Sequence, residues 1–166
     1  MEILVDVEVR FRLAEVTSDF DEFVRAVADK IDSASVVATH DGVLYVTLSG
    51  PGRPLAVAVE LATRLEALGS TIDDIDDDLV DLSEIAARVG RSREAIRLWS
   101  SGKRGAGGFP LPVGVLPGSV KVWDWSSVNS WLALSQPALA DPVRYLNRVE
   151  RSTFRSRRKG KIKAAS

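Results

Sequence analysis

The stretch LSEIAARVGRSREAIRLWSSGKRG, residues 82–105, has the apolar spacing of two short helices joined by a tight turn. The inward stripe of the first helix is predicted to be Leu82, Ile85, Ala86 and Val89. Gly90 follows at the turn, because glycine adopts left-handed dihedral angles at little cost. Ser92 is placed to cap a second helix. The inward positions of that helix are predicted to be Ala95, Ile96 and Trp99.

This spacing favours a helix-turn-helix over two ordinary amphipathic helices in a small core. The motif requires a small residue within its first helix, because the second helix crosses it closely, and Ala86 holds that position. It also requires a turn glycine and two buried apolar residues further on, which are Gly90, Ile96 and Trp99. Since all four positions agree, residues 82–101 are predicted to form a helix-turn-helix.

The residues that follow resemble the winged helix-turn-helix of the MerR and excisionase-like group. The matching residues are Phe109-Pro110-Leu111-Pro112-Val113, Trp123, Val128 and Trp131-Leu132. The resemblance covers residues 79–134 and implies a short β-hairpin and a closing helix that Ser126 or Ser127 would cap. The long coiled coil and sensor tail of MerR regulators have no counterpart here, so their response to effectors is not implied. The chain is also similar to an actinobacterial type of small protein, in which such a domain follows an acidic α/β module.

The resemblance implies that the second helix lies in the major groove of DNA. Its DNA-binding candidates, carried over by position, are Ser92, Arg93, Glu94, Arg97, Ser101, Lys103 and Arg104. Arg93 or Arg97 would bind guanine in bidentate fashion. Glu94 would either accept a hydrogen bond from cytosine N4 or pair with Arg97, and Ser92 is better assigned to capping. The glycine-rich loop at residues 103–108 is expected to follow the phosphate backbone or enter the minor groove.

The four tryptophans have two interpretations. They are able to stack on bases, as in proteins that bind single strands. The preferred interpretation is that most of them build the core of the winged helix, which has few other large residues. Trp125, between Asp124 and Ser126, is expected to be the most exposed of the four.

The N-terminal part, residues 1–78, alternates strand and helix patterns in the order βαββαβ. Apolar and charged residues alternate over residues 3–13, and helical spacing follows Ser18 or Asp19. Two further strands flank Asp41-Gly42, a strong hairpin signal. A helix over residues 55–68 and a strand over 71–75 complete the order. The fold class is therefore predicted to be α+β, with a ferredoxin-like sandwich before the winged helix. The free face or an edge of its sheet is expected to form a homodimer.

The net charge of −1 conceals a division along the chain. Residues 1–80 carry 17 acidic and 6 basic side chains, whereas residues 81–166 carry 6 acidic and 16 basic ones. This asymmetry favours a basic part that binds polyanions. The segment 136–166 is predicted to be a connector, a short helix at 143–149 and a basic tail that is disordered beyond Phe154. The tail would add non-specific phosphate contacts, from Arg155, Arg157, Arg158 and Lys159. A further hypothesis is that the acidic module covers the basic face or tail.

Catalytic, metal and cofactor motifs are absent from the sequence. The chain has no cysteine, a single histidine at position 40, and no hydrolase, zinc-protease or nucleotide-binding fingerprint. The run DDIDDD, residues 73–78, is interpreted as a solvated edge or linker rather than a metal site. We therefore expect no enzyme activity, no cofactor and no metal. No apolar run is long enough to span a membrane, and no signal peptide is evident.

These observations predict a cytoplasmic, nucleoid-associated protein with domains at 1–78 and 79–135 and a tail at 136–166. Its predicted partner is double-stranded DNA, which it would bind sequence-specifically as a homodimeric transcriptional regulator. One alternative is an excisionase-like architectural factor that bends DNA. The other is an adaptor whose N-terminal module captures a protein partner.

Overall fold

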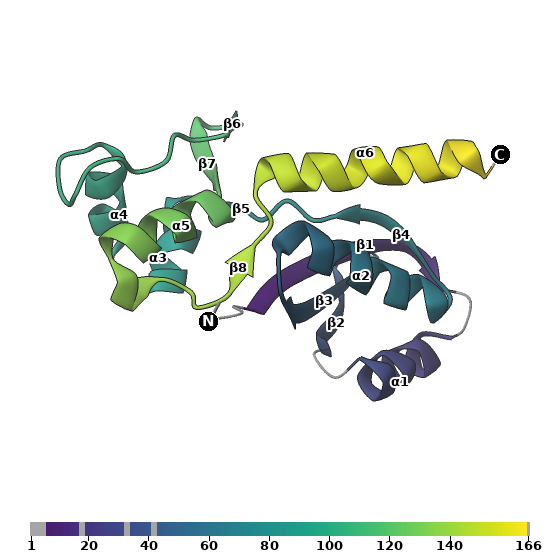
Figure 1. Ribbon diagram of the computed structural model, residues 1–166. Coiled ribbons are helices and arrows are strands. Elements are labelled where there is room, and N and C mark those ends of the chain that lie inside the picture. Colours follow the sequence, from purple (N-terminus) through teal and green to yellow (C-terminus); the bar gives the residue numbers. More distant parts are fainter. Residues whose placement is uncertain (1–5, 17–18, 32–33, 41–42, 166) are drawn as a thin grey trace. The chain divides into compact units, whose positions relative to one another are not determined.

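The computed structural model describes residues 6–16, 19–31, 34–40 and 43–165 and divides the chain into two compact units (Figure 1). Unit 1 consists of residues 1–76 together with 143–166, and unit 2 consists of residues 77–142. Each unit has its own β-sheet together with helices, which is compatible with the predicted α+β class. The division lies within two residues of the predicted boundary, but residues 143–166 belong to unit 1 instead of forming a separate tail.

The sheet of unit 1 is built from four strands in the order β2-β3-β1-β4, and all neighbours are antiparallel. The strands are β1 (Asp6–Val16), β2 (Ala34–His40), β3 (Val43–Pro51) and β4 (Ser70–Ile75). A short strand near the C-terminus, β8 (Arg144–Tyr145), adds parallel pairing to the start of β1. The predicted turn at Asp41-Gly42 lies outside the described residues, although the strands on either side of it pair with each other.

Two helices of unit 1 follow the predicted pattern: α1 (Phe20–Lys30) and α2 (Pro54–Ala67). Asp19 caps α1, because its carboxylate accepts a hydrogen bond from the Glu22 amide at 2.8 Å. Ser18, the other candidate cap, lies outside the described residues. Val7, Val9, Phe11 and Leu13, on one face of β1, are buried in a core that α1 and α2 also line. The alternation on β1 thus points one row of side chains toward the helices.

The opposite face of β1 is polar. Arg10 lies over the Tyr45 ring, 4.2 Å from its centroid, and the Arg12 guanidinium donates to Asp73 at 2.7 Å. Asp76 forms an ion pair with Arg10 at 3.4 Å. Among the described residues, the sheet face expected to pair in a dimer is therefore charged, and the acidic run is engaged in ion pairs instead of being simply solvated.

The predicted disorder beyond Phe154 is wrong, because residues 148–164 form a single long helix, α6 (Arg148–Ala164). A capping box starts it: Asn147 accepts from the Glu150 amide, and the Glu150 side chain accepts from the Asn147 amide, both at 2.9 Å. Leu146 and Phe154 are buried in the unit 1 core, and α6 packs against α2 and β4 (Figure 1). The short helix predicted at 143–149 is also wrong, because β8 and the cap at Asn147 precede α6, which starts only at Arg148.

Unit 2 contains three helices, a three-stranded antiparallel sheet in the order β5-β7-β6 and one 3-10 turn. Its elements are β5 (Leu79–Val80), α3 (Leu82–Val89), α4 (Arg93–Ser100), β6 (Gly114–Leu116), β7 (Val120–Asp124), α5 (Trp125–Ser135) and η1 (Pro137–Leu139). The predicted caps of α5 are wrong by two or three residues, since the buried Asp124 carboxylate accepts from both the amide and the hydroxyl of Ser126.

All four tryptophans lie in unit 2 and are buried. The expectation that most of them build the core is confirmed. The expectation that Trp125 is exposed is wrong, because its exposed fraction is 3% and the Arg88 guanidinium lies 4.9 Å from its ring centroid. Trp125 is the first residue of α5 and is one of the buried residues of that helix.

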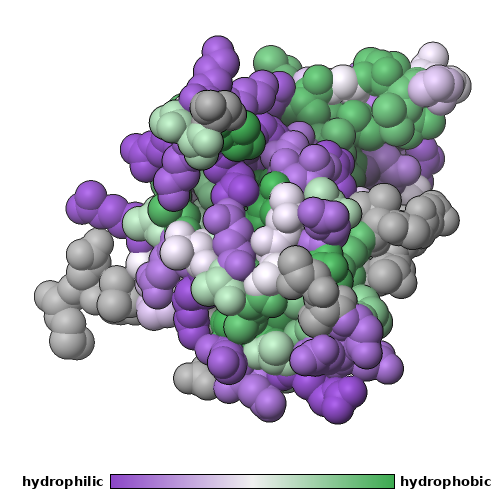
Figure 2. Space-filling view, turned by 90° about the vertical axis from the view of Figure 1, so that its right-hand side faces the viewer, coloured by the Kyte–Doolittle hydropathy of each residue, from purple (hydrophilic) through white to green (hydrophobic). Residues whose placement is uncertain are grey.

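The net charges of the two units differ from the net charges of the two halves of the sequence. Unit 2 has seven acidic and seven basic side chains, so it is neutral overall. The basic excess belongs to residues 143–166, which carry nine basic side chains and one acidic one and form part of unit 1. The acidic N-terminal segment and the basic C-terminal segment therefore fold together. Hydrophobic and hydrophilic residues are interspersed on the face shown in Figure 2, and among the described residues no helix is long and apolar enough to cross a membrane.

Candidate nucleic-acid interface

The candidate interface is built on α3, α4 and the turn between them. Asp81 caps α3 by accepting from the Glu84 amide at 2.8 Å, and Ser92 caps α4 by accepting from the Ala95 amide at 3.1 Å. Gly90 adopts the left-handed conformation with φ 63°, and the next amide, that of Arg91, donates to the Ala86 carbonyl at 3.0 Å. The turn therefore has the geometry that glycine was expected to supply.

Apolar side chains hold the two helices together. Ile85 and Ile96 are fully buried, and Ala86, Val89 and Trp99 are buried as well. All five were predicted to face inward, and three of them, Ala86, Ile96 and Trp99, also hold positions that the motif requires. The charged side chains of α4 are exposed, on the side of the helix away from these apolar residues.

Arg88 fixes α3 to the start of unit 2. Its guanidinium donates to both carboxylate oxygens of Asp78, at 2.6 and 2.9 Å, and to Glu84 at 2.9 Å. Burial alone would lower the pKa of Arg88, but the two carboxylates raise it above the ordinary arginine value. The i,i+4 spacing of Glu84 and Arg88 was visible in the sequence, whereas the contact with Asp78 depends on the fold.

The outward face of α4 carries Arg93, Glu94 and Arg97. Arg97 donates to the Glu94 carboxylate at 2.7 and 2.5 Å, which is the pairing alternative that the sequence left open. This hydrogen bond lowers the pKa of Glu94 and raises that of Arg97. Arg93 is exposed, and its side chain has no hydrogen bond or ion pair to any described residue. Arg93 is thus the α4 cation that is immediately available to an anion.

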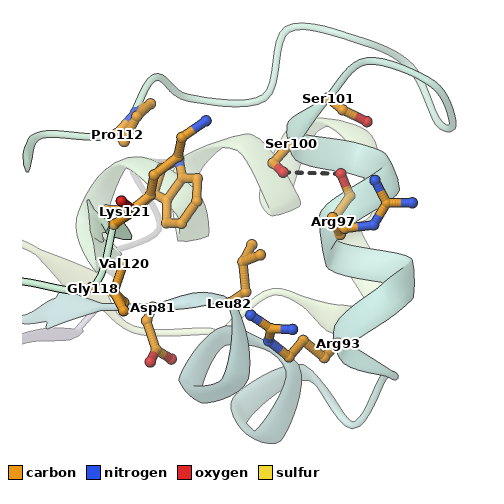
Figure 3. A pocket seen from close by; sticks show the side chains of 12 residues that line it. Asp81, Leu82, Arg93, Arg97, Ser100, Ser101, Pro112, Gly118, Val120 and Lys121 are labelled. Atoms are coloured by element: carbon orange, nitrogen blue, oxygen red, sulfur yellow. Dashed lines mark hydrogen bonds between the residues drawn. The ribbon is translucent and has the colours of Figure 1, made fainter. Parts of the chain in front are cut away.

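An open pocket of about 430 Å³ separates α4 from the β6–β7 hairpin. Cations from both sides line it: Arg93 and Arg97 from α4, and Lys121 from β7. In Figure 3 the Arg93 side chain extends toward Leu82 and Asp81, whereas that of Arg97 points away from the hairpin. Lys121 was missed as a site residue, because only its place beside α4 in the fold gives it a role.

The glycine-rich loop after α4 is held by tryptophans. The indole N–H of Trp131 donates to the Gly107 carbonyl at 2.8 Å, and that of Trp123 donates to the Pro110 carbonyl at 3.0 Å. Gly105 has φ 88° and lies against Trp99, where an added Cβ would approach the ring to 3.2 Å. The backbone path of the loop is therefore fixed from inside unit 2.

The cations of this loop point outward. Lys103 and Arg104 are exposed, and within the described ranges neither side chain has an ion-pair or hydrogen-bond partner. Ser101 ends α4, and its hydroxyl donates to the Leu98 carbonyl at 3.2 Å. A fixed backbone with two exposed cations is suited to contact a phosphate chain without rearrangement.

The sequence-predicted site residues fall into two groups. Ser92, Arg93, Glu94, Arg97, Ser101, Lys103 and Arg104 lie together in unit 2. Arg155, Arg157, Arg158 and Lys159 lie on α6 in unit 1. Arg155 donates to Asp74 at 2.7 Å, and Arg158 pairs with Glu66, so both side chains are engaged within unit 1, and their assignment to DNA stays a prediction. Their ion pairs join residues distant in sequence and attach α6 to β4 and α2.

Comparisons of the chain with protein-family models, with curated proteins and with solved structures returned no match.

Proposed function

We propose that unit 2 binds double-stranded DNA, with α4 in the major groove and the loop at residues 102–108 on the phosphate backbone. The single observation that carries the proposal is the exposed cation set beside a left-handed turn between two capped helices. The set, which we term the unit 2 cations, consists of Arg93, Lys103, Arg104 and Lys121. In this interpretation the β6–β7 hairpin is the wing of a winged helix-turn-helix.

The arrangement of charge supports this function more than the net charge does. Unit 2 is neutral overall, but three of its carboxylates are engaged by other groups: Asp78 and Glu84 hold Arg88, and Asp124 is buried. Asp81 accepts from the backbone of α3. None of the four unit 2 cations has an ion pair with a described residue to break when a duplex binds, whereas Arg97 is paired with Glu94.

The two arginines of α4 have different roles in the proposal. Arg93 is free to bind a guanine edge in bidentate fashion, which is worth about 1–3 kcal/mol of discrimination between bases. Arg97 must first leave Glu94, or else the pair stays intact and Glu94 accepts a hydrogen bond from cytosine N4. Lys103, Arg104 and Lys121 contact phosphates and position the helix.

Unit 1 would form the contact between two copies of the chain in a homodimer. Its strand order β2-β3-β1-β4 is the one expected of a ferredoxin-like sandwich, and such modules often associate through a sheet. We propose a homodimeric transcriptional regulator acting on DNA in the cytoplasm. Dimerisation through the polar sheet face would use ion pairs and hydrogen bonds, so we favour an edge strand as the contact.

A second candidate is an architectural factor that bends DNA. The observation that favours it is the apolar surface of the hairpin: Val115 and Leu116 on β6 are 63% and 52% exposed. Leu116 directly precedes the turn at Pro117, and apolar side chains of this kind unstack base steps when they enter the minor groove. A DNA circular-permutation assay separates the two candidates, since a regulator that inserts no apolar side chain between base steps leaves the duplex straight.

The proposed function is tested by selecting bound duplexes from a random pool with the full-length protein. We expect a preferred site whose recovery depends on Arg93. The variant Arg93→Gln should lose discrimination at one base pair, and Arg53→Gln, an exposed arginine of unit 1, serves as the matched control. A selection that enriches no duplex would contradict sequence-specific binding, and capture of a protein partner without any duplex affinity would favour the adaptor alternative.

A further inference from the structure

The helix α6 uses its cations in two different ways. Three of them face unit 1: Arg151 is buried and donates to the Leu146 carbonyl, Arg155 binds Asp74, and Arg158 binds Glu66. Arg155 also donates to the Ile75 carbonyl at 2.9 Å. These inward cations attach the helix and are not available to a ligand.

The other cations of α6 face solvent. They are Arg148, Arg157, Lys159, Lys161 and Lys163, all of them exposed. None has a hydrogen bond or ion pair with its side chain in the part of the chain that the structure describes. Glu150 is the one acidic residue of α6, and its carboxylate is occupied by the capping box at the start of the helix.

Helical spacing arranges four of these cations in two rows. Arg157 and Lys161 are one turn apart, and so are Lys159 and Lys163. Between the rows, on the outward side of the helix, lies a low ridge formed by the small exposed residues Ser156 and Gly160. The two rows of cations beside this low ridge, which we term the α6 cationic face, allow a phosphodiester chain to approach the helix closely.

The α6 cationic face destabilises the protein when no anionic ligand is bound. Like charges one turn apart repel each other and destabilise a helix. Two carboxylates of unit 1 that contact α6, Glu66 and Asp74, are already paired with Arg158 and Arg155. A bound polyanion would relieve this repulsion, whereas no carboxylate of α6 does so.

We propose that the α6 cationic face is a second DNA-binding surface, which binds duplex phosphates independently of unit 2 and without sequence preference. A duplex fits better than an acidic membrane, because a helix that lies on a membrane needs a large exposed apolar face. The main apolar anchor of α6, Phe154, is buried in the core of unit 1. The proposal goes beyond the function of unit 2, because it assigns DNA contact to the unit whose N-terminal segment is acidic.

The test measures the affinity of the full-length protein for a labelled duplex of scrambled sequence at several salt concentrations. The test variant combines Arg157→Gln, Lys159→Gln, Lys161→Gln and Lys163→Gln, because glutamine retains helix propensity. Each lost phosphate contact should reduce the slope of log K against log salt by about 0.9, so the slope should fall by about 3 to 4. Affinity at low salt should fall at least tenfold. The control combines Lys30→Gln and Arg53→Gln, two exposed cations of unit 1 outside α6, and should change neither quantity.

The failure of this proposal is distinguishable from failure of the proposed function. A variant with Arg93→Gln, Lys103→Gln and Arg104→Gln tests unit 2 alone. If the α6 variant keeps the wild-type slope while the unit 2 variant loses part of it, the α6 proposal is overturned and the function of unit 2 stands. If instead the α6 variant loses part of the slope and the unit 2 variant keeps it, the α6 proposal is supported and DNA binding by unit 2 is contradicted. Vesicles containing phosphatidylserine form the last arm: α6-dependent binding to vesicles, without any α6-dependent binding to duplex, would also overturn the proposal.

Discussion

The ring of Phe154 packs against the ring of Phe11, with 6.2 Å between their centroids. This contact joins the C-terminal helix to the first described strand, 143 positions earlier in the chain. Both side chains are buried in the core of unit 1. Unit 2 is consequently an insertion between two segments of unit 1, and the basic C-terminal segment is structural as well as charged.

The substitution Phe154→Ala should destabilise unit 1 by about 3–5 kcal/mol, because it removes a fully buried aromatic ring and leaves a cavity. Urea unfolding followed by far-UV circular dichroism measures the change. Val149→Ala is the control on the same helix, since Val149 is 74% exposed and should cost little. Equal stability of the two variants would contradict the packing of α6 on unit 1.

Removal of residues 143–166 should unfold unit 1 and leave unit 2 folded. The truncated chain lacks Leu146 and Phe154, and the inward face of β1 then loses part of its cover. All four tryptophans belong to unit 2, so tryptophan fluorescence reports unit 2 alone. We expect an unchanged fluorescence transition and a loss of far-UV signal. A fluorescence transition that disappears together with the tail would show that unit 2 depends on it.

Gly90→Ala should destabilise unit 2 by about 1 kcal/mol or more, because alanine is strained at a positive φ. Gly90 has a φ of 63°, and a Cβ added there would meet no atom within 4 Å. Backbone strain, and not a steric clash, would therefore cause the loss of stability. Gly160→Ala is the matched control. Gly160 lies within α6 with nothing near its missing Cβ, so alanine should stabilise unit 1 by about 1 kcal/mol. Changes of the same sign in both variants would be inconsistent with the described turn.

Glu94 should titrate below the ordinary glutamate range, because Arg97 donates to its carboxylate and lowers its pKa. The pair therefore persists as the pH falls and is lost only when the pH passes below that lowered pKa. Side-chain NMR of Glu94 measures the titration, and Arg97→Gln should return the pKa toward its ordinary value. Identical titrations in the two proteins would mean that the pair does not form in solution.

Freeing Arg97 should also strengthen duplex binding. Glu94→Gln removes a negative charge from the face of α4 and leaves Arg97 without its carboxylate partner. The affinity for scrambled duplex should rise several-fold at low salt, and the rise should vanish at high salt, where exposed charges are screened. Glu60→Gln, an exposed carboxylate of α2 in unit 1, is the control. Weaker binding by Glu94→Gln would instead support a direct contact of Glu94 with a base.

Local signals explain which elements could be predicted from sequence. The helices α3 and α4 match the prediction closely because Gly90 and Ser92 act on residues close to them in the sequence. The strand and helix order of unit 1 follows from alternation and helical spacing in the same way. A pattern that depends on near neighbours is readable without knowledge of the fold.

The features that the sequence did not indicate are contacts between distant segments. Arg155 and Arg158 find their carboxylates 81 and 92 positions away, and no local pattern indicates such pairs. The capping box of Asn147 and Glu150 was a local signal for α6 that could have been read, but the density of charge favoured disorder instead. Trp125 was misjudged because its polar neighbours in sequence are not its neighbours in the fold.

The most direct test of the account is the salt dependence of duplex binding by the full-length protein, compared with the variant that carries Arg93→Gln, Lys103→Gln and Arg104→Gln. We predict that the wild-type protein binds at low ionic strength and that log K falls steeply with log salt. The variant should bind more weakly, with a slope reduced by about 2 to 3. A wild-type protein without measurable affinity for duplex at low ionic strength, or a variant indistinguishable from it, would contradict the assignment of α4 and its loop to DNA.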